Sequence, residues 1–246
     1  MVNADYNILK DWMFGKLSSL LDNIEPNPKY SVLKMSLGEP SLGVPNFSKN
    51  ILDLNYKDWA NYPPTEAIPI FGKSIINYIR RRYPSAEKLV NLKKNIVPVP
   101  GTREPLHLIG LLAKNLKVGE TTALVTNPFY HAWLAGSISS GSKIHWLNCS
   151  LENNYLPDIS NLPKNLLNST VIMYICSPSN PHGRVASINY LKETILLARK
   201  YNFILAIDEC YGDIYRMNKP KPPGGLEAAA SLGHGLDNIV VFNSLS

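Results

Sequence analysis

The sequence predicts an α/β fold in which helices sandwich a mostly parallel sheet. From about residue 68, short apolar runs alternate with longer runs of helical periodicity. Such alternation is typical of a parallel sheet with helices on both faces. The chain has 246 residues, of which 45% are hydrophobic and 18% charged, and this suits one large globular domain.

The elements of this fold are predicted in chain order from the periodicity of apolar residues. Thr102 is the predicted N-cap of one helix, and residues 217–225 are expected to form a surface loop. Helices are predicted over residues 6–22, 68–83, 102–116, 129–140 and 187–201, and strands over residues 95–99, 121–126, 143–147, 170–176, 203–207 and 238–242.

Charge and cysteine usage narrow the function classes. The net charge is +6, but the basic residues are scattered and no basic motif is interleaved with aromatics, so we expect no nucleic-acid partner. No apolar stretch approaches a membrane span and the N-terminus lacks the apolar core of a signal peptide, so we expect no membrane partner and a cytoplasmic location. Cys149, Cys176 and Cys210 are widely spaced, which fits a reducing compartment, and no metal site is predicted.

Polar residues follow the first predicted strands at their carboxyl ends, where open α/β sheets bind ligands. Gly101-Thr102-Arg103 is a turn into a helix N-terminus, which can bind an anion. Taken alone, it could equally be an ordinary capped helix start. Tyr130 follows the strand over 121–126, where a core aromatic is the common alternative.

The later strands end in the same way. Asn180 lies in a Ser-Pro-Ser-Asn-Pro-His-Gly turn that could also be a plain β-turn. Asp208 directly follows an apolar strand, where a carboxylate needs a partner such as a protonated pyridine nitrogen. Ser244 and Ser246 follow the last strand and on their own form a polar loop. Together these groups match the phosphate, flat ring, phenolic oxygen and ring nitrogen of pyridoxal 5′-phosphate.

From Ser36-Leu37-Gly38-Glu39-Pro40 to Ser246, the sequence resembles the class I/II aminotransferases of fold type I. Three motifs carry the resemblance in order: Ser-Pro-Ser-Asn-Pro-x-Gly, Asp-Glu-x-Tyr and Asn-Ser-Leu-Ser. The resemblance implies a pyridoxal-phosphate-binding large domain over residues 36–246, incomplete at its C-terminus. It also implies an arm over residues 1–35 that would pack on a small domain absent from this chain.

The resemblance implies roles for the residues at the phosphate and ring of the cofactor. Gly101, Thr102 and Arg103 would bind the phosphate, chiefly through backbone amides. Ser244 would add a phosphate contact, and Tyr130 would stack on the pyridine ring.

Further roles follow from the same resemblance. Asn180 and Tyr211 would hydrogen-bond the phenolic oxygen, and Asp208 would pair with the ring N–H. Gly38 would line the site of the substrate carboxylate. Tyr62 would reach the phosphate bound by the other subunit of a homodimer.

The catalytic lysine of the family forms a Schiff base with the cofactor and moves the substrate proton. Its place would be the position after Ser246, and neither Lys143, Lys192 nor Lys200 is a good substitute. We therefore expect this chain to be inactive alone, as a truncated, split or frameshifted reading frame.

Several runs are similar to the bacterial succinyldiaminopimelate aminotransferases of lysine biosynthesis. This similarity implies N-succinyl-LL-diaminopimelate as amino donor and 2-oxoglutarate as acceptor. Ala67, His182 and Arg184 depart from the usual pattern, and Arg184 could crowd the cofactor or point to solvent. The runs are Leu9-Lys10-Asp11-Trp12, Pro63-Pro64-Thr65-Glu66, Gly101-Thr102-Arg103-Glu104, Asp208-Glu209-Cys210-Tyr211 and Pro222-Pro223-Gly224-Gly225-Leu226-Glu227-Ala228-Ala229.

Two alternatives remain open. The chain could be a non-catalytic fragment or half of a split enzyme, and downstream sequence with a lysine and a Gly-x-Arg pattern would identify it. It could also catalyse another pyridoxal-phosphate reaction, such as β-elimination, on the same fold. A nicotinamide enzyme is not expected, since no strand is followed by Gly-x-Gly-x-x-Gly.

Overall fold

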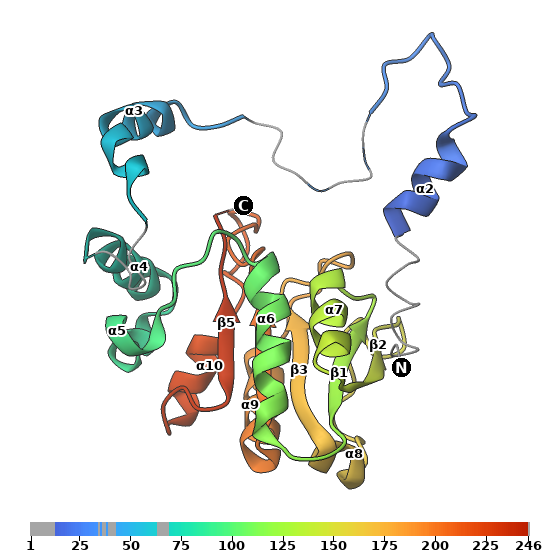
Figure 1. Cartoon of the computed structure of the whole chain (residues 1–246). Helices are drawn as coiled ribbons and strands as arrows, with labels where there is room; N and C mark the ends of the chain where they lie inside the picture. The colour runs from blue at the N-terminus through green and yellow to red at the C-terminus, as the bar shows by residue number, and fades with distance from the viewer. Residues whose placement is uncertain (1–12, 34, 36–37, 39–42, 63–68, 246) are drawn as a thin grey trace. The chain divides into compact units, whose positions relative to one another are not determined.

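The computed structural model describes residues 13–33, 35, 38, 43–62 and 69–245 (Figure 1). The chain divides into two compact units, residues 1–65 with residue 246, and residues 66–245. Within the predicted N-terminal helix over residues 6–22, residues 13–21 are helical and Asp22 lies in a turn, and the start of the helix lies outside the described residues. The predicted domain limits of 1–35 and 36–246 stay a prediction. The first unit contains α2 (Met13–Leu21), α3 (Asn46–Leu54) and the 3-10 helix η1 (Tyr56–Ala60).

The second unit is built on one sheet of five parallel strands in the order β2-β1-β3-β4-β5. The order reverses between β1 and β3, since the chain runs from β1 to one side and from β3 to the other. Such a switch point opens a crevice at the carboxyl ends of the strands, where ligands bind in open α/β sheets. The strands are β1 (Thr122–Asn127), β2 (Lys143–Asn148), β3 (Thr170–Cys176), β4 (Ile204–Asp208) and β5 (Ile239–Phe242).

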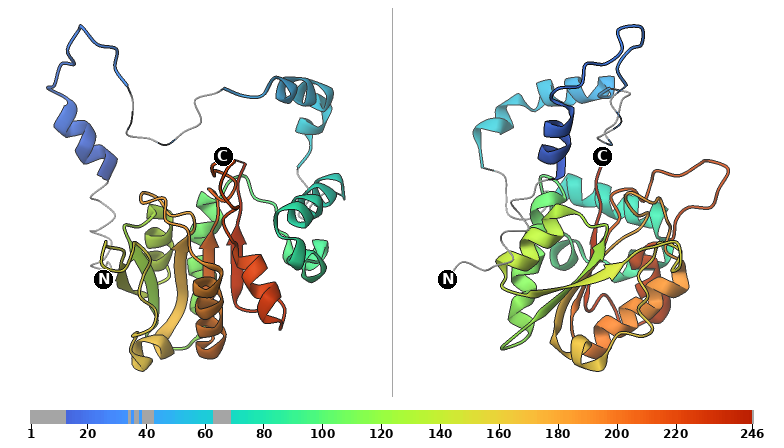
Figure 2. Two further views of the ribbon diagram at one scale, coloured as in Figure 1. Left: turned by 180° about the vertical axis from the view of Figure 1, so that it is seen from behind. Right: turned by 90° about the vertical axis from the view of Figure 1, so that its right-hand side faces the viewer.

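Helices cover both faces of this sheet, as predicted (Figure 2). Helices α6 and α7 cover one face, and α9 and α10 cover the other. The 3-10 helix η2 contacts both α4 and α10. The remaining elements of this unit are α4 (Pro69–Arg82), η2 (Pro84–Leu89), α5 (Leu92–Asn95), α6 (Arg103–Ala113), η3 (Lys114–Leu116), α7 (His131–Ser139), α8 (Lys164–Ser169), α9 (Ile188–Tyr201) and α10 (Gly225–Leu232).

The sheet is buried because its strands supply apolar side chains to both faces. Met173 and Ile175 of β3 belong to the core shared with α9, whereas Tyr174 belongs to the core shared with α6 and α7. This two-sided burial explains the continuous apolar runs in the sequence. The resulting rigid sheet places the ends of β1, β3 and β4 at one edge.

Helix α9 shows how the local sequence sets the helix limits. The hydroxyl of Ser187 accepts a hydrogen bond from the backbone N–H of Tyr190 at 3.1 Å, which caps the helix start. Leu191, Ile195 and Ala198 recur at helical spacing and are fully buried. Asn202 then ends the helix in the left-handed conformation, with φ of 51°.

Helices α6 and α7 approach each other closely through two glycines. A Cβ added at Gly136 would lie 2.3 Å from the backbone oxygen of His107. A Cβ added at Gly110 would lie 2.7 Å from the Tyr174 hydroxyl and 2.9 Å from the Gly136 carbonyl carbon. Only glycine permits this backbone contact.

The predicted strand over residues 95–99 is wrong. Asn91 starts a short helix instead, because its side chain accepts hydrogen bonds from the N–H groups of Lys93 and Lys94 at 3.0 and 3.2 Å. Pro98 and Pro100 then deprive the following segment of backbone donors, and a central strand needs these donors.

Two further local predictions need correction. The side chain of Thr102 makes no capping hydrogen bond, although Thr102 precedes the first residue of α6. The end of the predicted surface loop over residues 217–225 is not at the surface, since Pro222, Gly224 and Gly225 are buried. Gly225 begins α10 and Gly224 precedes it as the N-cap residue. This helix was not predicted, because two consecutive glycines at its start give no apolar periodicity there.

Candidate active site

The candidate active site lies where β1, β3, β4 and β5 end. Cys176 at the end of β3 pairs in register with Asp208 at the end of β4, and Asp208 pairs with Phe242 of β5. The predicted site residues that come after β1, β3, β4 and β5 therefore follow strands that end at one edge. Gly101, Thr102 and Arg103 follow no strand, because residues 95–99 form none. Their roles stay predictions, and only their positions are observed.

Asp208 is a buried carboxylate, with 4% of its surface exposed. Its Oδ1 accepts a hydrogen bond from the backbone N–H of Cys210 at 3.2 Å. Burial raises the pKa of Asp208, whereas hydrogen bonds from Cys210 lower it. A cationic partner at this carboxylate would offset the cost of burying its charge.

Asn180 and Tyr211 meet at this edge, although they are far apart in sequence. The Asn180 side-chain amide donates to the Tyr211 hydroxyl at 3.3 Å. The turn that holds Asn180 is closed by the N–H of Gly183, which donates to the Ser179 carbonyl at 2.7 Å. Gly183 has φ of 67°, which favours glycine. Arg184 is exposed, so its side chain points to solvent.

Arg103 and Tyr130 link the starts of two helices. The Arg103 Nε donates to the Tyr130 hydroxyl at 3.2 Å, which joins the N-terminus of α6 to that of α7. Gly101 has open space beside it, since the nearest atom to an added Cβ is a Glu104 oxygen at 3.9 Å. The first N–H groups of a helix have no intrahelical acceptor, so this start can bind an anion. Tyr130 also makes an edge contact with Trp133, with ring centroids 6.1 Å apart.

The remaining predicted residues are less closely tied to this edge. Ser244 is half-buried, two residues after β5. Gly38 and Tyr62 belong to the unit over residues 1–65, and Tyr62 is almost fully exposed. Ser246 and Ala67 lie outside the described residues. The phosphate contact of Ser244 and the roles of Gly38 and Tyr62 stay predictions.

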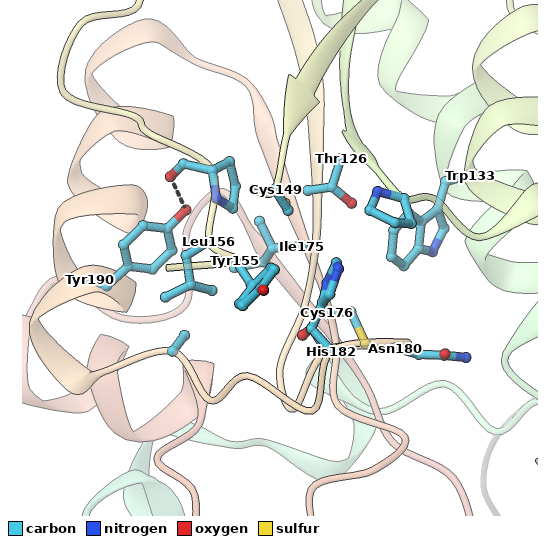
Figure 3. Close-up of a pocket in the computed structure, with 14 residues that line it drawn as sticks. Thr126, Trp133, Cys149, Tyr155, Leu156, Ile175, Cys176, Asn180, His182 and Tyr190 are labelled. Atoms are coloured by element: carbon cyan, nitrogen blue, oxygen red, sulfur yellow. Dashed lines mark hydrogen bonds between the residues drawn. The ribbon is translucent and has the colours of Figure 1, made fainter. Parts of the chain in front are cut away.

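A small cavity lies beside the site, between the ends of β1 and β3 (Figure 3). Its volume of about 20 Å³ suits one water molecule and no cofactor. The Trp133 indole N–H is buried and has no hydrogen-bond partner among the described residues. His182 stacks on Tyr155 with centroids 4.5 Å apart and is exposed, as a turn residue would be. The cavity is therefore too small to be a candidate cofactor site.

Two features near Asp208 escaped the sequence reasoning. The thiol of Cys176 donates to the Pro178 carbonyl at 3.1 Å, and its hydrogen bond with Cys210 and its burial raise its pKa. Glu209 is 3% exposed, and burial raises its pKa to about 7. The only signal for Glu209 was a second acid directly after Asp208.

Among the residues that the structure describes, no group of three or more His, Cys, Asp or Glu side chains could hold a metal ion. Within the same part of the chain, no helix is long and apolar enough to cross a membrane. The groups at the edge fit a phosphorylated pyridine ring: a helix start for phosphate, an aromatic ring, an amide with a phenol, and a buried carboxylate.

Comparisons with known proteins agree with this fit. Residues 30–246 match the family model described as aminotransferase class I and II. An LL-diaminopimelate aminotransferase from Dehalococcoides mccartyi is 30% identical over 217 residues, which cover 87% of this chain and 53% of the relative. An aminotransferase structure from Neisseria meningitidis has a TM-score of 0.86 at 30% identity and covers 99% of this chain and 61% of its own. The structure of aminotransferase AspB from Helicobacter pylori has a TM-score of 0.84 at 28% identity and covers 95% of this chain and 59% of its own. The chain thus spans about half the length of the curated relatives it matches.

Proposed function

The chain belongs to the class I and II aminotransferase family, and from this we propose that it forms the cofactor-binding part of an enzyme that moves an amino group from an amino acid to a 2-oxo acid. Enzymes of this family depend on pyridoxal phosphate. The bound cofactor supplies a protonated pyridine ring that acts as an electron sink. The single observation that carries the proposal is the buried Asp208 at the strand edge, beside the linked Asn180 and Tyr211.

The residues of the chain have separate tasks in this proposal. The Asp208 carboxylate holds a proton on the ring nitrogen, because burial strengthens its attraction to a cation. Asn180 and Tyr211 donate hydrogen bonds to the phenolic oxygen. Tyr130 stacks on the ring, and the start of α6 holds the phosphate with its free N–H groups.

We propose N-succinyl-LL-diaminopimelate as the amino donor and 2-oxoglutarate as the acceptor, in lysine biosynthesis. The Pro222–Ala229 run supports the succinylated donor. The relative from Dehalococcoides mccartyi favours a second candidate, LL-diaminopimelate itself. The two donors differ at the distal nitrogen, which is cationic in the free amino acid and carries an anionic succinyl group in the other.

The partners of the protein are also proposals. We propose a cytoplasmic homodimer in which Tyr62 of one subunit reaches the phosphate bound by the other. The high exposure of Tyr62, 99%, supports a contact made outside its own unit. Amino acids and 2-oxo acids are the proposed small-molecule partners, with neither nucleic acid nor membrane among them.

An amino-transfer assay on the natural gene product tests the proposal. The expected result is glutamate formed from 2-oxoglutarate with N-succinyl-LL-diaminopimelate, at a higher kcat/KM than with LL-diaminopimelate. The reverse preference would replace the donor and keep the reaction. Formation of ammonia and a 2-oxo acid without an acceptor, from an amino acid with a leaving group on its β-carbon, would indicate β-elimination. No turnover with bound cofactor would support the non-catalytic alternative.

A further inference from the structure

We propose that Glu209 is a positioning residue that holds Asp208 and Tyr211 in place, by tying the turn that carries them to the end of α4 and the start of α10. The inference deepens the proposed function and rests on it, since that function assigns Asp208 and Tyr211 to the cofactor ring. Glu209 itself touches neither the cofactor nor the substrate in this proposal.

Every polar atom of Glu209 has a partner. The Tyr83 hydroxyl donates to Glu209 Oε2, and the backbone N–H of Gly225 donates to Oε1 at 2.6 Å. The backbone N–H of Glu209 donates to the Phe242 carbonyl at 2.9 Å, and its carbonyl accepts from Gly212 at 2.8 Å. One buried residue thus joins α4, α10, β5 and the turn after β4.

A buried cation completes this junction. Arg82 is 6% exposed, and its Nη2 donates to the carbonyls of Gly212 at 3.2 Å and Pro222 at 2.7 Å. Its Nε lies 3.1 Å from the Asp213 carboxylate, and its guanidinium lies over the Tyr83 ring at 4.6 Å. Arg82 therefore holds the far side of the same turn, and its positive charge offsets the negative charge of the Asp213 and Glu209 carboxylates.

The junction explains a sequence motif that the proposed cofactor site leaves unused. A Cβ added at Gly224 would lie 2.3 Å from the Tyr83 ring and 2.8 Å from Glu209 Oε2. A Cβ added at Gly225 would lie 2.3 Å from the Ile207 side chain. The Pro-Pro-Gly-Gly run therefore lets the start of α10 approach Glu209, where a helix N-terminus stabilises a carboxylate.

The side chains of the turn separate into two groups. Asp208 and Tyr211 belong to the candidate site. Asp208 accepts a hydrogen bond from the Cys210 N–H within the turn, and Tyr211 accepts one from the Asn180 amide at the sheet edge. Glu209 lies between them in sequence and contacts α4 and α10 instead. Loss of the Glu209 contacts frees the backbone on both sides of it, and both site residues shift together.

Two measurements on the chain test this role. The first is the protonation of the ring nitrogen of bound ¹⁵N-labelled pyridoxamine 5′-phosphate by NMR, which needs no covalent bond to the protein. The second is amide hydrogen exchange of Cys210 in the free chain, which reports the contact to Asp208. Glu209→Ala and Glu209→Gln are compared with Asp208→Asn as reference and with Ile195→Val, a core change in α9, as a control for general loss of stability.

We expect Glu209→Ala to lower the ring-nitrogen pKa of the bound ligand by about one unit and to speed Cys210 exchange about tenfold. Glu209→Gln is expected to keep both close to the parent values, since its amide oxygen still accepts from Gly225. Ile195→Val is expected to change neither. Unchanged values in Glu209→Ala, or equal changes in Ile195→Val, would overturn the positioning role.

The two proposals fail in different ways. If the parent chain does not bind pyridoxamine 5′-phosphate, or if Asp208→Asn leaves the ring nitrogen unaltered, the proposed function fails. The exchange of Cys210 then still decides whether Glu209 positions Asp208. If Glu209→Ala does not fold, Tyr83→Phe replaces it, and an unaltered Cys210 exchange rate in that variant refutes the role.

Discussion

At the scale of single residues, the main feature is a pair of adjacent acids that are both buried but contact different parts of the molecule. Asp208 accepts from its own turn and lies at the sheet edge, whereas Glu209 is enclosed by Tyr83 and the start of α10. Burial raises the pKa of both carboxyl groups, but only Asp208 lies at the edge where a ligand cation can offset that cost.

Replacement of the Asp208 charge tests its role directly. We expect Asp208→Asn to weaken pyridoxamine 5′-phosphate binding by about tenfold to a hundredfold, because hydrogen bonds to charged groups contribute about 1.5–3 kcal/mol. Fluorescence titration of the ligand measures this change. Asp237→Asn, at an exposed site, is the matched control, and equal affinities of the two variants would contradict the prediction.

Burial of Glu209 predicts a pH-dependent stability. Its pKa is about 7 in the fold against an ordinary value of 4.5, so the folded chain binds this proton more tightly than the unfolded chain. The contribution of this bound proton to the free energy of unfolding is complete below pH 4.5 and is lost as the pH rises through about 7. We expect the parent chain to lose about 3 kcal/mol more than Glu209→Gln between pH 4.5 and pH 8. Urea unfolding at both pH values measures the difference, and parallel losses would disprove it.

At the scale of elements, the contact between α6 and α7 is the tightest packing feature. An alanine in a helix is favoured over glycine by about 1 kcal/mol. However, a Cβ at Gly136 would lie 2.3 Å from the His107 carbonyl oxygen, which is backbone and cannot rotate away. The clash therefore outweighs the gain in helix propensity.

We expect Gly136→Ala to lower the free energy of unfolding by about 1–3 kcal/mol. Chemical denaturation followed by circular dichroism measures this loss. Ser139→Ala, an exposed change on the same helix, serves as control and should have little effect. A stabilised Gly136→Ala variant would show that the two helices can separate at little cost.

The elements also show what the sequence could predict. Strands β1 to β5 were found within about a residue, because buried strands read as apolar runs. The prediction of a strand over residues 95–99 was wrong because it did not account for Pro98 and the following Pro100. The hydrogen bonds between Tyr83 and Glu209 and between Asn180 and Tyr211 join residues far apart in sequence. No local sequence pattern records such contacts. The strand ends that form the edge of the sheet could therefore be predicted, but the hydrogen bonds that join residues from different elements could not.

At the scale of the whole molecule, the net charge of +6 favours anionic ligands. We expect association of pyridoxamine 5′-phosphate to slow as salt rises from about 10 mM to about 0.3 M, since screening shortens the reach of the field. Stopped-flow fluorescence measures the rate. Neutral pyridoxine is the control, and the same salt dependence for both ligands would rule out attraction by the phosphate charge.

The backbone contact between Gly110 and Gly136 has a consequence for ligand choice. Sliding of one helix along the other would press these backbones together, so we expect the helix starts to keep a constant spacing. The start of α6 carries the predicted phosphate amides, and Tyr130 immediately precedes α7. If these residues have their proposed roles, the distance from phosphate to stacked ring is set before a ligand binds, and we expect the site to favour ligands of matching length. We expect a ligand with a longer linker between its ring and its phosphate to bind more weakly, because the two contact points cannot move apart to accommodate it.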